Sequence, residues 1–233
     1  LLDALKEIPE QPLTFQISES LEVTIIYQNG EYRIVGQNAD EYPSAAVLSD
    51  NSTKIEMDSQ ILSDGLARTI FATADDDLRP VMNGIFFDID ENGTTFVSSD
   101  GHKLVCSQNS TVTAEGKSSF ILPKKPASLF RALLGKEPKN VTIEFDSRIA
   151  RFSLPEFNMV CRLIDGIYPA YRSVIPKNNP NKMTISRTEL LGAVRRMAVY
   201  SNQATSVIML KVADGELMIS AEDTGNATSA YER

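Results

Sequence analysis

The sequence predicts an α+β protein that contains much antiparallel sheet and is built from tandem copies of one domain. Short apolar segments of strand length alternate with helical segments, and turn residues separate the strands. The order strand, helix, strands, helix, strands recurs along the chain. Hydrophobic residues make up 42% and charged residues 23% of the 233 residues. This is the composition of a globular domain, so it excludes disorder.

The recurrence has a period of about 127 residues. Tyr168-Pro169 follows Tyr42-Pro43 by 126 residues, and a leucine-rich segment and a strand-like segment precede each pair. Lys182–Ile185 follows Lys54–Met57 by 128 residues, and each opens a helical stretch in our interpretation. A period this long excludes a solenoid and favours tandem homologous domains.

Three helices are predicted from apolar spacing and end signals. The first covers Gln60–Thr73, with Ile61, Leu62, Leu66 and Ile70 on one face. The second starts after Lys124-Lys125-Pro126, where Pro126 fits the first helical turn and Gly135 fits the position just past the end. The third begins at Ser186, which forms a capping box with Glu189 and precedes Leu190, Leu191, Val194, Met197 and Ala198 at helical spacing.

Short apolar or β-branched runs predict the strands. They cover residues 14–17, 23–27, 85–89, 95–98, 141–145, 150–154, 159–163, 207–212 and 216–221. Asp90–Gly93 and Ala213–Gly215 resemble hairpin turns, since Asn, Asp and Gly tolerate positive φ. Residues 176–181, with two prolines and three asparagines, read as an interdomain linker, and residues 44–53 are a weaker candidate for a second one.

The charge balance and the cysteines limit the class of protein. The net charge of −8 argues, taken alone, against a bulk nucleic-acid binder. Cys106 and Cys161 are too few for a disulfide scaffold, so we expect reduced thiols and a cytoplasmic protein. No apolar run approaches the length of a membrane span, and no signal peptide is visible.

Motifs for chemistry are mostly absent. The sequence has no P-loop, no dinucleotide-binding glycine motif and no spacing of His and Cys that suits a metal site. Ser98–His102 contains the residue types of a catalytic triad, but triads are assembled from residues remote in sequence. Asp75–Asp77 lacks the spacing of a calcium loop and reads as a solvated segment.

Basic residues concentrate on the predicted helices. They include Arg68 on the first helix, Lys124, Lys125 and Arg131 on the second, and Arg195 and Arg196 on the third. A basic helical surface on an acidic protein suits contact with phosphate. No aromatic residues interleave with these charges, so contact with a duplex backbone is favoured over capture of single strands.

Two longer motifs resemble a known family. Leu78–Ile85 (LRPVMNGI), followed by Phe96–Leu104 (FVSSDGHKL), resembles the central domain of the bacterial DNA polymerase III beta subunit, the sliding clamp. Leu163–Pro176 (LIDGIYPAYRSVIP) resembles the junction between the second and third domains of that family. The motifs occur in the family's order, the resemblance covers essentially the whole chain, and the period agrees with the family's tandem domains.

The resemblance implies tandem sliding-clamp domains, with helices lining an inner surface and antiparallel sheets outside. Residues 1–50 would be the C-terminal part of domain 1, residues 51–178 a complete domain 2, and residues 179–233 the N-terminal part of domain 3. The chain is therefore expected to be incomplete at both ends. In the intact protein, two protomers would close head to tail into a ring around duplex DNA.

The resemblance also implies a processivity factor for DNA replication that performs no catalysis and needs no cofactor or metal. Its partners would be duplex DNA, the polymerase III alpha subunit, the clamp loader and other proteins with clamp-binding peptides, and no membrane. A peptide cleft at the junction of domains 2 and 3 would include Met82, Ser99, Gly101, His102, Lys103, Leu104, Pro169 and Val174.

Two other interpretations of the residues remain open. One is a small acidic hydrolase or nuclease that uses Asp75–Asp77 and His102. The other is a repeat scaffold that does not bind DNA, which predicts no basic inner surface.

Overall fold

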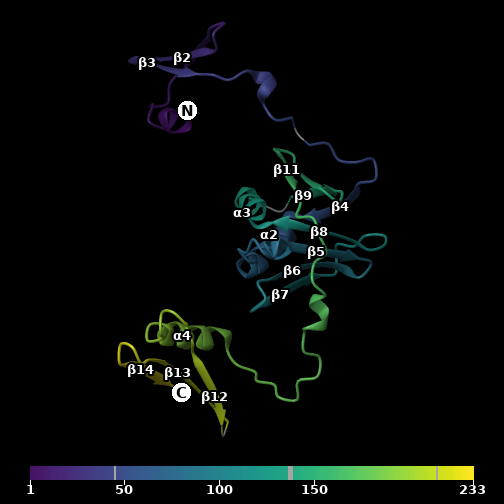
Figure 1. The fold of residues 1–233 in the computed structure, drawn as a ribbon, viewed down its shortest axis with the longest axis vertical. Helices are drawn as coiled ribbons and strands as arrows, with labels where there is room; N and C mark the ends of the chain where they lie inside the picture. The colour runs from purple at the N-terminus through teal and green to yellow at the C-terminus, as the bar shows by residue number, and fades with distance from the viewer. Residues whose placement is uncertain (45, 136–138, 214) are drawn as a thin grey trace. The chain divides into compact units, whose positions relative to one another are not determined.

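A computed structural model describes residues 1–44, 46–135, 139–213 and 215–233. The chain divides into two compact units, Leu1–Tyr171 and Arg172–Arg233 (Figure 1). Both contain helices and antiparallel sheets, so the prediction of an α+β fold is confirmed. Across the described residues, every helix is too short or too polar to cross a bilayer.

The first unit begins with a helix and a small antiparallel sheet of order β1-β2-β3. The elements are α1 (Leu2–Lys6), β1 (Thr14–Ile17), β2 (Glu22–Tyr27), β3 (Gly30–Val35) and the 3-10 turn η1 (Ala39–Glu41). Ile25 in β2 is buried, whereas β1 is exposed along its whole length.

Two four-stranded antiparallel sheets follow in the same unit. One has the order β11-β10-β9-β4, and the other has the order β7-β6-β5-β8. The strands are β4 (Thr53–Asp58), β5 (Gly84–Asp90), β6 (Gly93–Ser99), β7 (Leu104–Asn109), β8 (Ser118–Pro123), β9 (Asn140–Phe145), β10 (Ile149–Ser153) and β11 (Asn158–Arg162).

Helices α2 (Ser59–Thr69) and α3 (Lys124–Leu133) lie side by side and contact strands of the sheets (Figure 1). The 3-10 turns η2 (Ile70–Ala72) and η3 (Pro80–Met82) connect α2 to β5. Alternate residues of β4, β5, β8, β9 and β10 enter one apolar core, as the two-residue period of a strand requires. In β5 these are Ile85, Phe87 and Ile89, and each is inaccessible to solvent.

Aromatic contacts run through this core. The ring of Phe87 lies 4.3 Å from that of Phe120 in β8, and Phe120 lies 4.5 Å from Phe145 in β9. Because β8 and β9 belong to different sheets, the second contact joins the two sheets. Phe130 of α3 packs at 4.7 Å from Phe152 of β10 and fixes the helix to the same core.

The apolar face predicted for the first helix is confirmed. Leu62 and Leu66 are completely buried in the core, and Ile61 and Ile70 pack against it. The α-helix ends at Thr69, four residues before the predicted end, and continues as the 3-10 turn η2. Asp58 caps its N-terminus, since the Asp58 side chain accepts a hydrogen bond from the Gln60 amide at 2.7 Å.

The second unit has one helix and one antiparallel sheet of order β12-β13-β14. Its elements are α4 (Arg187–Ala198), β12 (Met209–Ala213), β13 (Glu216–Asp223) and β14 (Thr228–Glu232). The 3-10 turn η4 (Tyr171–Ser173) lies at the boundary between the units. As predicted, the Ser186 side chain caps α4 by accepting a hydrogen bond from the Glu189 amide. The buried face of α4 contains Ala193 and Met197, whereas Leu191 and Ala198 are exposed.

Other local predictions need correction. Lys54–Met57 belongs to β4 and the helix begins after it, because Ile55 and Met57 alternate into the core with strand period. Lys182–Ile185 forms neither helix nor strand. The predicted linker at 176–181 likewise has no helix or strand, whereas the weaker one at 44–53 runs into β4 at Thr53. The predicted turn at Ala213–Gly215 includes residue 214, which lies outside the described residues.

Helix α2 packs so closely on the sheet at position 65 that the residue there has to be glycine. A Cβ atom at Gly65 would lie 2.7 Å from the ring of Phe96, which is itself buried. We expect Gly65→Ala to lower the free energy of unfolding by about 1–3 kcal/mol through overpacking, measured by chemical denaturation.

The matched control is Gly192→Ala in α4. There a Cβ would lie 3.2 Å from the guanidinium of Arg196, whose side chain is 60% exposed and can shift by a few tenths of an ångström. Alanine should be neutral or stabilise by up to about 1 kcal/mol, because it has the higher helix propensity. Equal effects of the two substitutions would contradict the packing of α2 on Phe96.

Candidate functional site

A second, smaller apolar cluster lies on the outer face of the sheet β7-β6-β5-β8, opposite the main core. Val97, Ile121, Tyr168 and Tyr171 are its buried members. Phe86, Val81, Leu104 and Ile164 pack against it. Phe86 pairs with Val97 and with Ile121 across the strands, so these three side chains share one face of the sheet. The chain that follows β11 thus covers this face with Ile164, Tyr168 and Tyr171.

Two tyrosines hold this covering segment in place. The ring of Tyr168 stacks on Phe86 with centroids 4.7 Å apart and an interplanar angle of 3°. Burial is the main reason that the pKa of Tyr168 rises to about 12, so its hydroxyl stays neutral. The Tyr171 hydroxyl donates a hydrogen bond of 2.8 Å to the buried Asp88 carboxylate. The segment is therefore fixed to the sheet by apolar and by polar contacts.

The turn between β6 and β7 forms a polar rim beside this cluster. Asp100 Oδ1 accepts hydrogen bonds from the amides of His102 and Lys103, both at 2.9 Å, and its other oxygen pairs with the Lys103 ammonium. The hydrogen bond from Lys103, followed by those from the two amides, holds the pKa of Asp100 far below its ordinary value. Gly101 has a φ of +91°, which glycine alone adopts without strain, and Arg79 lies against it.

The structure brings together the segments of the first unit that carry the predicted cleft residues. Ser99, Gly101, His102, Lys103 and Leu104 form the rim turn and the start of β7. Met82 follows Val81, and Pro169 follows Tyr168, so both adjoin members of the outer cluster. Met82 and Leu104 are half-buried, whereas His102, Lys103 and Pro169 are exposed. Val174 lies in the second unit and is exposed there.

The predicted DNA-facing residues fall on helices, but they differ in their electrostatic surroundings. Three of them pair with carboxylates: Arg68 with Asp64 at 3.6 Å, Lys124 with Asp75 at 2.9 Å, and Arg196 with Glu232 at 2.8 Å. Lys125 and Arg131 on α3 and Arg195 on α4 are exposed, and none of them pairs with a carboxylate in the described part of the chain.

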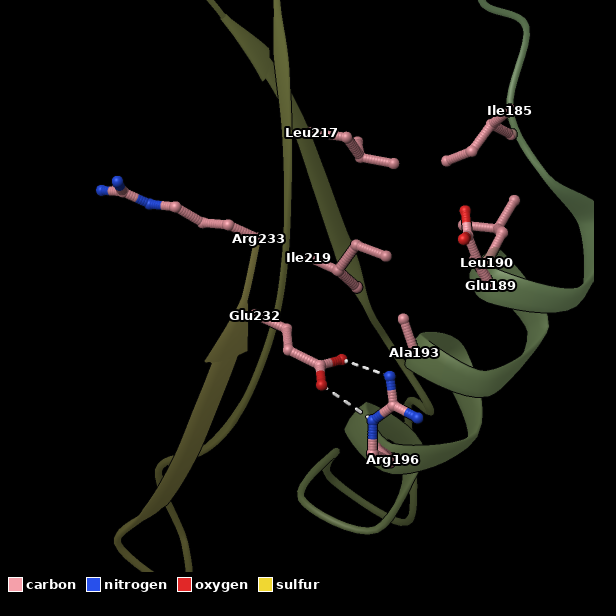
Figure 2. A pocket seen from close by; sticks show the side chains of 9 residues that line it. All are labelled: Ile185, Glu189, Leu190, Ala193, Arg196, Leu217, Ile219, Glu232 and Arg233. Carbon is pink, nitrogen blue, oxygen red and sulfur yellow. Dashed lines mark hydrogen bonds and ion pairs between the residues drawn. The ribbon is translucent and has the colours of Figure 1, made fainter.

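Arg196 faces the sheet of the second unit. Its guanidinium donates two hydrogen bonds to the Glu232 carboxylate of β14, at 2.8 and 3.0 Å (Figure 2). The pair borders a hollow of about 390 Å³ between α4 and the sheet, which Leu190, Ala193 and Ile219 also line. Of the two neighbouring arginines predicted to face DNA, Arg195 is thus the one without a carboxylate partner.

Two of the three aspartates of the hydrolase alternative pair with basic side chains. Asp75 pairs with Lys124, and Asp76 pairs with Arg79 through a hydrogen bond of 2.9 Å. That bond from Arg79, with a second from the Leu78 amide, lowers the pKa of Asp76. Over the described ranges, no group of three His, Cys, Asp or Glu side chains is placed to hold a metal ion. Nothing in this arrangement supports a hydrolase.

Sequence reasoning missed several residues on which the site depends. Phe86, Tyr168 and Tyr171 build the outer cluster, and Arg79 lies against the rim turn. Asn83 bridges the acidic loop, since its side chain accepts from the Asp76 amide and donates to the Asp76 carbonyl, each at 3.0 Å. The sequence signal that could have found Phe86 is strand periodicity. Phe86 lies between Ile85 and Phe87, so it faces the side of β5 opposite the main core.

This combination of a two-sheet, two-helix unit with an outer-face cluster is the sliding-clamp fold. It resembles the crystal structure of the DNA polymerase sliding clamp from Bacillus subtilis with a TM-score of 0.90 at 20% identity, covering 99% of this chain and 61% of that one. It also resembles a sliding clamp from Pseudomonas aeruginosa bound to griselimycin, with a TM-score of 0.87 at 22% identity and coverage of 99% and 62%.

The sequence comparisons give the family. The model of the DNA polymerase III beta subunit, central domain, matches residues 56–170, and that of the C-terminal domain matches residues 172–232. The two matches together cover about three quarters of the chain, which therefore belongs to the DNA polymerase III beta subunit family.

Curated relatives agree with this assignment. The beta sliding clamps of Synechococcus elongatus and Staphylococcus aureus are each 24% identical, over 240 and 221 residues respectively. The aligned regions cover 99% and 94% of this chain, but only 63% and 58% of those proteins. The chain thus spans about three fifths of the length of these relatives. The predicted boundaries at 50/51 and 178/179 stay predictions.

Asp100 should be responsible for the conformation of the rim turn. We expect Asp100→Ala to increase hydrogen exchange at the amides of His102 and Lys103, because each loses its acceptor. Asp77→Ala, in another exposed loop, is the control and should leave these amides unchanged. Undiminished protection in Asp100→Ala would show that the turn is held by other contacts.

Proposed function

We propose that this chain is part of a DNA sliding clamp, a non-catalytic processivity factor that encircles duplex DNA and tethers the replicative polymerase. The observation that carries the proposal is the sliding-clamp fold together with the match to both domains of the beta subunit family. In the intact protein, two protomers would form the ring. A role in replication would place the protein in the cytoplasm.

The proposed DNA contact uses the exposed cations of the helices. Lys125 and Arg131 lie on α3, which packs beside α2, so their charges belong to one helical layer. Contacts with phosphate carry no sequence information, which suits a protein that must slide. Arg68, Lys124, Arg195 and Arg196 complete the proposed set, with the paired members contributing less than Lys125, Arg131 and Arg195.

The proposed peptide contact uses the outer cluster and its rim. Within the first unit, Met82, Leu104 and Pro169 would supply an apolar floor, and Ser99, Gly101, His102 and Lys103 would supply a polar edge. Val174 is the remaining residue of the proposed set. Such a surface suits a short peptide with a small hydrophobic anchor. The polymerase III alpha subunit and the clamp loader would bind through such peptides. Clamp structures with bound griselimycin support a ligand-binding surface in the family.

DNA binding should be electrostatic and should depend on the unpaired cations. We expect the double variant Lys125→Glu, Arg131→Glu to weaken binding to duplex DNA for every sequence tested. The slope of log affinity against log salt should fall by about 0.9 for each lost phosphate contact. Fluorescence anisotropy over a salt series measures both. Lys117→Glu, in the exposed loop before β8, is the matched control. A salt-independent affinity would argue against backbone contact.

Peptide binding should depend on the rim turn. A peptide with a clamp-binding motif, titrated into the labelled protein, should shift the NMR signals of residues 102–104 and 168–169. His102→Ala should weaken binding, whereas Glu91→Ala, in the turn at the opposite end of β6, should not. Shifts confined to other parts of the chain would rule out this assignment of the cleft.

A further inference from the structure

The acidic loop at Asp75–Asp77 lies against the start of the basic helix α3. The Asp75 carboxylate and the Lys124 ammonium are 2.9 Å apart although 49 residues separate them in the sequence. The Asp75 side chain is 88% exposed and that of Lys124 is 41% exposed, so DNA phosphate could reach the pair from solvent. One of the cations that the proposed function assigns to DNA contact is thus already paired with a carboxylate.

Backbone contacts independent of the ion pair hold the two residues at this distance. The Ala74 amide donates to the Met82 carbonyl at 2.9 Å, and the Lys124 amide donates to the Asn83 carbonyl at 3.0 Å. The Asn83 side chain adds its two hydrogen bonds to Asp76. Residues 82 and 83 therefore anchor both the acidic loop and the N-terminus of α3. Loss of the Asp75 charge would leave this arrangement in place.

We propose that Asp75 is an intramolecular competitor for DNA phosphate at Lys124 and lowers the affinity of the clamp for duplex DNA. This inference rests on the proposed function. A phosphate that approaches Lys124 has to displace the carboxylate or share the ammonium with it. In either case the ammonium stabilises bound phosphate less than a free lysine would. The pair of Arg68 with Asp64, one turn apart on α2, acts in the same direction.

A DNA affinity lowered by the Asp75–Lys124 ion pair would suit a ring that has to slide along DNA. Each neutralised cation removes one counterion-releasing contact and so reduces the salt dependence of binding. Lys125, the next residue along α3, has no such partner among the described residues and keeps its full charge. The two adjacent lysines at the start of α3 therefore differ in how strongly each attracts phosphate.

The test compares Asp75→Asn with Asp77→Asn in the full chain, measured by anisotropy with a fluorescent duplex over a salt series. Both variants remove one negative charge from the same exposed loop, but within the described ranges only the first breaks an ion pair. We expect Asp75→Asn to bind about two- to fivefold more tightly than Asp77→Asn. Its salt slope should be steeper by about 0.9.

A double-mutant cycle identifies the partner. In a Lys124→Ala background, Asp75→Asn should have no more effect than Asp77→Asn, because the competing pair no longer exists. Equal effects of the two single variants would overturn the proposal, and so would an Asp75→Asn effect that persists without Lys124. In either of these outcomes the proposed function still stands if the wild-type chain binds duplex DNA in a salt-dependent manner and the Lys125→Glu, Arg131→Glu variant binds it more weakly. If the wild-type chain shows no such binding, the proposed function and the competitor role of Asp75 are both overturned.

Discussion

The contact between Phe120 of β8 and Phe145 of β9 joins the two four-stranded sheets of the first unit, against which helices α2 and α3 pack. Phe87 and Phe96 extend this aromatic stack beneath α2, while Phe130 fixes α3 against Phe152. Large rings in an interior of this kind tolerate little change in volume. Helices α2 and α3, which carry Arg68, Lys124, Lys125 and Arg131, are therefore held firmly against one core.

The segment from Ala74 to Asn83 connects the two candidate surfaces of the first unit. Near its middle, Arg79 lies against Gly101 in the rim turn, and Val81 packs into the outer cluster. At its end, Asn83 holds the acidic loop and receives the Lys124 amide. One short stretch without an α-helix or a strand thus positions residues of the proposed peptide surface and of the proposed DNA surface.

Net charge describes this protein poorly because the charges are paired locally. An excess of acidic residues gives −8 for the whole chain, yet the helices present cations. Half of the six predicted DNA-facing residues have a carboxylate within 4 Å, and the other half have none among the residues that the structure describes. The electrostatic character of each helix is thus decided by neighbours that include residues remote in sequence, such as Asp75 for Lys124 and Glu232 for Arg196.

The α+β class, the position of α2 and α3, most strands and the family follow from sequence patterns, because each depends on periodicity, end signals or a contiguous motif. Long-range contacts set which side of β5 carries Phe86 toward Tyr168, and which lysine of the adjacent pair Lys124 and Lys125 meets a carboxylate. Lys54–Met57 shows the same limit, since its strand pairing with β9 is a contact with residues more than eighty positions away. Contacts between distant segments leave no local pattern, and they fix the electrostatics of the candidate site.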